Sequence, residues 1–131
     1  MESWFAELLQ QGGPMAVSVL QLAAPALAVS IFHAISPRRW AWWAGAIAVL
    51  AILAIGLLGF VQGRGRTDDA VASWSRDAKT SKADLADMHE RGYLEALRPL
   101  QFGGVFAGAC ALPLLVGEIR RRRRRSAVIA P

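Results

Sequence analysis

The sequence is poor in the residues that build metal, redox and catalytic sites. It has one cysteine, Cys110, and two histidines among 131 residues. A single cysteine forms neither an intrachain disulfide nor a cysteine metal cluster, and Cys110 lies in an apolar run where a thiol usually serves packing. The sequence also has no phosphate-binding glycine loop, nucleophile elbow or credible pair of carboxylates. We therefore expect no catalytic residues, no metal, no cofactor and no enzymatic activity.

Charged residues are few and unevenly placed. The chain is 54% hydrophobic yet has a formal net charge of +5, and six of its fifteen basic residues form the run 120–125. Long uncharged stretches alternate with short charged ones, which is typical of a chain whose solvent is partly lipid. A soluble chain this short has too small a core to hide three apolar segments of about 20 residues each. The sequence predicts an all-α integral membrane protein with three transmembrane helices.

The apolar and polar stretches divide the chain into six segments. Gly12 and Gly13 are expected to end a first short helix, and Pro14 is well placed to begin the next one. The predicted segments are an N-terminal amphipathic helix at 1–13, transmembrane helices at 14–35, 40–62 and 99–119, a polar extracytoplasmic amphipathic segment at 63–98, and a basic tail at 120–131.

The polar segment 63–98 contains weaker helix signals. Thr67 or Asp68 is placed to cap one amphipathic helix. Ser81 with Asp84 resembles a capping box for a second one, which Gly92 is expected to end. We expect these pieces to lie on the membrane or on the bundle.

Basic and aromatic residues predict the orientation in the membrane. Arginines follow the first and third spans, and loops with excess basic residues stay in the cytoplasm. The N-terminus is therefore expected outside and the C-terminus in the cytoplasm, in a multi-pass protein of the bacterial inner membrane. An arginine run directly after a span contacts anionic lipid headgroups rather than nucleic acid, and His33 is expected at the same boundary. The residues expected at the headgroups are Arg38, Arg39, Trp40, Trp43, Arg120, Arg121 and Arg122.

Small residues recur along the second and third spans, where they would let another helix approach closely. In the first span, Ser18 and Gln21 form a polar face that should turn toward a neighbouring helix, because an unpaired amide is costly in hydrocarbon. That face has two interpretations, a contact between helices or the lining of a pore. The residues expected to pack helices together are Gly45, Gly56, Gly59, Gly103, Gly104, Ala107 and Gly108.

Three motif-like stretches follow one another along the chain: LLQQGGPM at 8–15, IGLLGFV at 55–61 and YLEALRPLQFGGVFAGACALP at 93–113. In their order and orientation they resemble the MotA/TolQ/ExbB proton-channel family. The resemblance implies a homo-oligomer, and a single-span partner of the TolR/ExbD/MotB type that supplies the titrating carboxylate. It also implies a pore, whose candidate lining residues are Ser18, Gln21, Phe60, Gln62, Leu100 and Gln101.

The sequence departs from that family at functional positions. The family's pore threonines correspond to Phe60 and Leu100, which neither carry a proton nor hold water. Four residues, 36–39, stand where the family has a large cytoplasmic domain, and the segment 63–98 separates spans that the family joins directly. Three functions therefore stay open: an ion-coupled energy-transducing subunit, a non-conducting structural protein assembling through small-residue faces, and a lipid- or envelope-interacting protein.

Overall fold

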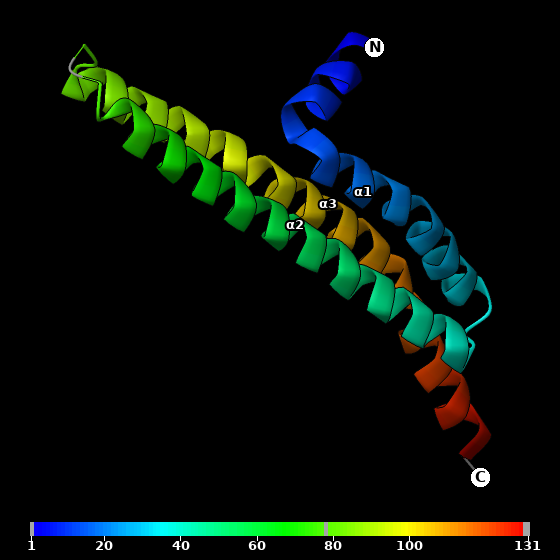
Figure 1. Ribbon diagram of the computed structural model, residues 1–131. Coiled ribbons are helices and arrows are strands. Elements are labelled where there is room, and N and C mark those ends of the chain that lie inside the picture. The colour runs from blue at the N-terminus through cyan, green and yellow to red at the C-terminus, as the bar shows by residue number, and fades with distance from the viewer. Residues whose placement is uncertain (1, 78, 130–131) are drawn as a thin grey trace.

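The computed structural model describes residues 2–77 and 79–129, with the side chains of Met15, 17–77 and 79–128. Its elements, all helical, are α1 (Glu2–Ile35), α2 (Arg39–Trp74) and α3 (Lys82–Ile129). Each of the three contains a stretch long and apolar enough to cross a membrane. In Figure 1, α1 descends toward the lower right, α2 returns to the upper left and α3 descends again to the C-terminus, so that α1 and α3 are parallel and α2 is antiparallel to both. The predicted three-helix, all-α architecture is confirmed.

The turn between α1 and α2 is short because proline and an extended arginine interrupt the helix. The residue before a proline disfavours helical backbone angles, and Pro37 places that restriction on Ser36, directly after α1 ends. Arg38 has φ −92° and ψ 142°, an extended conformation that reverses the chain before α2 begins. The backbone amide of Ser36 still donates to the Phe32 carbonyl at 2.8 Å and closes the last turn of α1.

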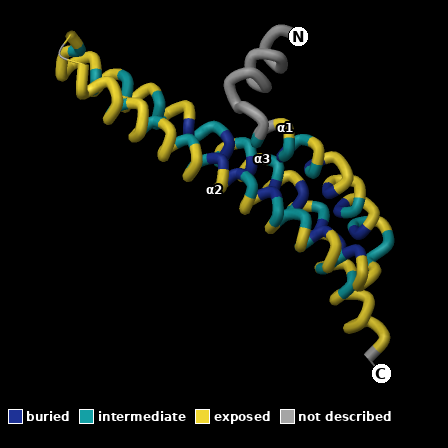
Figure 2. Tube along the Cα trace, viewed as in Figure 1, coloured by how far each residue is buried: buried dark blue, intermediate teal, exposed yellow. Residues whose placement is uncertain are grey.

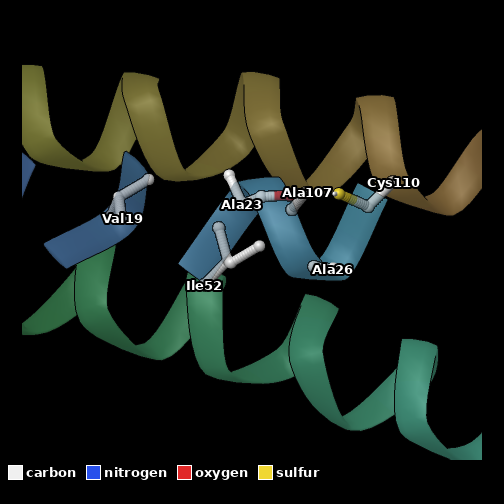
Figure 3. Packing of buried hydrophobic residues seen from close by; sticks show 6 residues of the cluster. All are labelled: Val19, Ala23, Ala26, Ile52, Ala107 and Cys110. Carbon is white, nitrogen blue, oxygen red and sulfur yellow. Dashed lines mark hydrogen bonds between the residues drawn. The ribbon is translucent and has the colours of Figure 1, made fainter. Parts of the chain in front are cut away.

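The core is a thin seam of small and medium side chains between the three helices. Buried positions recur every three or four residues on α1 and α3, which is the spacing of left-handed helix packing, and on α2 at Ala41, Gly45, Ile52, Gly56 and Gly59. Figure 2 shows these positions facing inward along the middle of the bundle, and Figure 3 shows six of them at close range. The cluster consists of Val19, Ala23 and Ala26 from α1, Ile52 from α2, and Ala107 and Cys110 from α3.

Two helix boundaries predicted inside the polar segment 63–98, a start at Thr67 or Asp68 and an end at Gly92, are wrong. Helix α2 continues without a break to Trp74 and α3 begins at Lys82, so Thr67 and Asp68 cap nothing and Gly92 ends nothing. The two helices extend together past α1 to a tip at 75–81, which is called the hairpin tip below (Figure 1). With 36 and 48 residues they are about 54 and 72 Å long. Both exceed the roughly 30 Å hydrocarbon core, so part of the hairpin reaches beyond it.

Contacts between α2 and α3 explain why the polar segment stays one hairpin. A side-chain methyl group at Gly92 would overlap Thr67, so glycine permits close approach here rather than stopping the helix. The Thr67 hydroxyl donates to the Gly63 carbonyl one turn earlier, at 3.0 Å. Just before the polar segment begins in α2, the Phe60 ring meets the Tyr93 ring of α3 edge to face, with 5.8 Å between the ring centroids. Each half of the segment therefore packs on the other half, and neither is an independent surface helix.

The two helices predicted for residues 1–35 form one continuous helix, α1. It runs continuously from Glu2 to Ile35, so the expected end at Gly12 and Gly13 and the expected start at Pro14 are not found. The amphipathic face predicted for 1–13 depends on side chains outside the described residues and stays a prediction. Pro99, expected to open the third span, lies within α3.

Ser81 caps α3, as its spacing to Asp84 predicted. Its hydroxyl accepts a hydrogen bond from the Asp84 backbone amide at 3.1 Å and donates to the Asp84 carboxylate at 2.6 Å. The carboxylate thus pairs with the hydroxyl, whereas in a full capping box it would accept from the Ser81 backbone.

Replacing Ser81 with alanine should loosen the hairpin tip. An alanine leaves the first amides of α3 without their side-chain partner, a loss of about 1 kcal/mol. Hydrogen exchange measured by mass spectrometry should quicken at the start of α3. The Ser75→Ala control removes a hydroxyl that bonds only the Ala72 carbonyl and should change little. Unchanged exchange at residues 82–85 in the Ser81 variant would refute the capping role.

Candidate functional site: the outer faces of α1 and α3 and the arginine end

Most of the expected packing residues lie where two helices nearly touch. A side-chain carbon added at Gly56 would lie 2.9 Å from the Pro99 carbonyl oxygen, and one at Gly103 would lie 3.2 Å from the Gly56 Cα. Gly45 faces Leu114 and Gly59 faces Pro99 in the same way. Ala107, one turn beyond Gly103, is buried in the core cluster. These residues bring α2 and α3 into backbone contact within one chain.

Gly104 and Gly108 lie on a different face of α3. A carbon added at either position would meet none of the described atoms of neighbouring segments within 4 Å, and both residues are exposed. They therefore take no part in packing the helices of a single chain. Their missing side chains leave a shallow strip of accessible backbone on the outside of α3.

The expected polar face of α1 does not turn toward a neighbouring helix of the same chain. Ser18 is half-buried, whereas Gln21 is exposed on the side of α1 opposite the buried positions Val19 and Ala23. The outer face of α1, defined by Val17, Gln21, Ala24, Ala28 and Ile31, therefore carries an amide among small and apolar side chains.

The remaining pore candidates do not gather into one path within the chain. Phe60 is half-buried against Tyr93, and Leu100 is half-buried. Gln62 is exposed and lines an open groove of about 400 Å³ beside Met15, Arg66 and Glu95. Gln101 is exposed together with the two outer glycines. The outer face of α3 is defined by Gln101, Gly104, Val105, Gly108 and Leu112.

The outer face of α2 has a different composition. Its exposed positions are dominated by bulky apolar side chains, and no glycine or glutamine stands among them between Arg39 and Val61. Such a surface suits contact with lipid chains, which demand neither close approach nor hydrogen bonds. The outer face of α2 consists of Trp43, Ile47, Leu50, Ala54, Leu57, Leu58 and Val61.

The predicted headgroup residues gather at one end of the bundle, called the arginine end below. Arg38, Arg39, Trp40 and Trp43 are exposed around the turn between α1 and α2. From α3, Arg120 donates through Nη1 to the Ala34 carbonyl at 3.1 Å. The positive charge of Arg120 also stabilises the negative, C-terminal end of the α1 helix dipole.

His33 lies at the arginine end, but its side chain is fully buried, which its place beside the headgroup residues did not predict. Nδ1 lies 3.1 Å from the Arg38 carbonyl oxygen. Because a carbonyl only accepts, this contact assigns the ring proton to Nδ1. Nε2 is buried and has no hydrogen-bond partner among the described residues. The signal that reveals His33 is the spacing of Val19, Ala23, Ala26, Ser30 and His33, one buried residue every three or four positions.

Gly117 of α3 makes room for His33, and an alanine there should destabilise the bundle. The added carbon would overlap the imidazole and lie 2.6 Å from the His33 carbonyl oxygen, which belongs to backbone. We expect a loss of about 2 kcal/mol from the strain of overpacking, measured by unfolding in mixed detergent micelles. Gly65→Ala, in open space, should instead gain up to about 1 kcal/mol from helix propensity. Equal stability of the two variants would contradict this packing.

Glu118 is the acidic member of the arginine end. Its Oε1 accepts from Arg121 Nη2 at 3.0 Å and from Arg122 Nε at 3.2 Å. Arg121 Nε lies 3.0 Å from Oε2, close enough for an ion pair but without the alignment of a hydrogen bond. The side chains of Glu118 and Arg121 are only 14% and 22% exposed, whereas that of Arg122 is 80% exposed. Arg121 is thus the partner that shares the buried environment of Glu118.

Neither a metal site nor a similar protein identifies a chemical role for these residues. Among the residues that the structure describes, no three histidine, cysteine or acidic side chains are placed to hold a metal ion. No protein-family model, curated protein or solved structure matches the chain.

Proposed function

We propose that the chain is an oligomer-forming structural subunit of an assembly in the bacterial inner membrane, with its arginine end in the cytoplasm. The observation that carries this proposal is the contrast between outer faces. Within the predicted spans, α1 exposes Gln21 and α3 exposes Gln101, Gly104 and Gly108, whereas α2 exposes mainly bulky apolar side chains up to Val61 and a glutamine, Gln62, only at the end of its span.

A glutamine that faces lipid leaves its amide without partners, and hydrocarbon offers none. Gln21 and Gln101 point away from the helices of their own chain, so a second chain is the natural source of their hydrogen bonds. Gly104 and Gly108 favour the same outcome, since glycines on a helix surface let another backbone approach closely. The polar and small residues thus act together as a contact between subunits.

The outer faces of α1 and α3 lie at the same depth in the membrane. Cys110 Sγ lies 3.9 Å from the Ala23 carbonyl, and Gly117 contacts His33, so α1 and α3 run side by side with a fixed offset. That offset puts Gln21 at the level of Gly104 and Gly108. The Gln21 amide of one copy can donate to backbone carbonyls of the next copy, because each carbonyl has a second lone pair.

A contact between α1 of one copy and α3 of the next joins two different surfaces. Such head-to-tail contacts close into rings when the rotation between subunits permits. The face of α2 then remains toward lipid, in keeping with its apolar side chains. A homo-oligomer of this kind also agrees with the resemblance to the MotA/TolQ/ExbB family.

Detergent-solubilised mass measurement tests the assembly. Leucine at both Gly104 and Gly108 should reduce the particle to a monomer, because the added side chains fill the strip of accessible backbone. The Cβ atom of neither leucine would meet a described atom of a neighbouring segment within 4 Å, and both positions are exposed, so the monomer fold should survive. The matched control carries leucine at Ala44 and Ala54, exposed on α2, and should stay oligomeric. A glycine variant with the wild-type mass would refute the proposal.

Ion coupling is a second candidate, favoured by the exposed Gln21 and Gln101. Amides that face each other across a subunit interface can hold water, which Phe60 and Leu100 cannot do. In this case a single-span partner must bring the titrating carboxylate. Liposomes containing the chain with such a partner, encoded beside it, should then show proton flux that the chain alone lacks. Absence of flux with the partner demonstrably bound would exclude ion coupling.

A further inference from the structure

A basic groove lies at the arginine end, between the turn that joins α1 to α2 and the last turns of α3. It has a volume of about 670 Å³, and its lining residues are Ser36, Pro37, Arg121, Arg124, Arg125 and Val128. Figure 1 shows α3 continuing past that turn to the C-terminus, which gives the groove one wall from each segment. It is separate from the outer faces that the assembly uses.

The arginines of this groove are the ones left without an acidic partner. Arg121 and Arg122 share Glu118. For Arg124 and Arg125, no described carboxylate lies within ion-pair distance, and both are exposed. Because residues 121, 124 and 125 are three and four positions apart, they share one face of α3. That face is directed at the turn and carries two unneutralised guanidinium groups.

Ser36 adds a neutral donor on the opposite wall. Its backbone amide and carbonyl are used within the turn, bonding the Phe32 carbonyl and the Arg38 amide. Its hydroxyl has no partner among the described residues and remains available. Two guanidinium groups and a hydroxyl form a set of donors suited to a phosphate group, which arginine binds through paired hydrogen bonds.

The surroundings of the groove distinguish between sources of phosphate. Ile35, directly before Ser36, is 71% exposed, and Trp40, just past the turn, is 55% exposed. An exposed apolar surface therefore adjoins the phosphate donors at the end of the membrane-spanning helices. A soluble phosphate uses only the donors, whereas a phospholipid also covers the apolar surface with its acyl chains. We infer that this groove is a specific binding site for the phosphate of an anionic phospholipid.

The test compares two pairs of arginines in the full-length protein. Phosphatidylglycerol or phosphatidylcholine is titrated onto protein in neutral detergent, and bound lipid is counted by native mass spectrometry. Arg124→Gln with Arg125→Gln removes the groove charges. Arg76→Gln with Arg123→Gln removes the same charge from exposed positions that do not line the groove.

The groove variant should lose phosphatidylglycerol affinity by about 100-fold, because two charge-assisted hydrogen bonds to the phosphate are removed, while the control loses less than about threefold. Wild-type protein should prefer phosphatidylglycerol over phosphatidylcholine, and millimolar inorganic phosphate should not displace the lipid. Equal losses in the two variants would mean diffuse attraction without a site and would overturn the inference. Displacement by inorganic phosphate would overturn it as well, by showing a site for soluble anions.

Discussion

Replacing Gly56 with leucine should force α2 and α3 apart and cost the protein about 3 kcal/mol of stability, at the upper end of overpacking effects. The contact involves backbone on both sides: a carbon at Gly56 would lie 2.9 Å from the Pro99 carbonyl and 3.3 Å from the Gly103 Cα. Backbone in two long helices has no alternative rotamer, so the strain spreads along the hairpin. Unfolding in mixed micelles, followed by circular dichroism, measures the loss.

Gly65→Leu is the matched control for this prediction. It makes the same substitution on the same helix, at a position with no neighbouring atom within 4 Å. It should be as stable as the wild type or slightly more so, because leucine favours helix over glycine. If both variants unfolded alike, the close approach of α2 to α3 would not determine stability.

Replacing Glu118 with leucine should cost about 2 kcal/mol, since breaking a half-buried ion pair leaves one charge without its partner, a loss between those of exposed and of buried pairs. Arg121, 22% exposed, is the group left without its partner, and it lies beside other arginines. Loss of the carboxylate removes its attraction for Arg121 and Arg122. The mutual repulsion of the neighbouring arginines, including Arg120, then remains. The expected result is a lower unfolding midpoint and earlier proteolysis at the arginine end.

Arg122→Leu is the control for this prediction. Its guanidinium contacts the same carboxylate but is 80% exposed, so its removal should cost less than about 1 kcal/mol. A double variant at Glu118 and Arg121 should recover part of the stability lost with Glu118 alone, because the unpaired charge is gone. Failure of that recovery would show that Glu118 acts through packing and not through charge.

The sequence predicted the features that depend on local or compositional signals. Segregation of apolar from charged residues predicted three long helices, and the Ser81–Asp84 spacing predicted the start of α3. The turn at Pro37 was also predictable, since proline restricts the residue before it.

The features that the sequence did not predict depend on partners distant in the chain. Gly92 has the local signature of a helix end, yet it is a contact site because Thr67 lies against it. Gly103 and Gly104 are neighbours with equal propensity, but one faces Gly56 and the other faces outward. Only the register between α2 and α3 separates their roles. In the same way, His33 is buried because Gly117 makes room for it.

The central claim, that α1 of one copy packs on α3 of the next, can be tested by cysteine cross-linking in native membranes. In a Cys110→Ala background, Ala24→Cys with Leu112→Cys places one thiol on each contact face and leaves both outer glycines intact. Oxidation should then give a ladder of disulfide-linked oligomers. The control pair Ala54→Cys with Leu112→Cys, which uses the outer face of α2, should stay largely monomeric. An absent ladder for the first pair, or an equal ladder for both, would contradict the assembly.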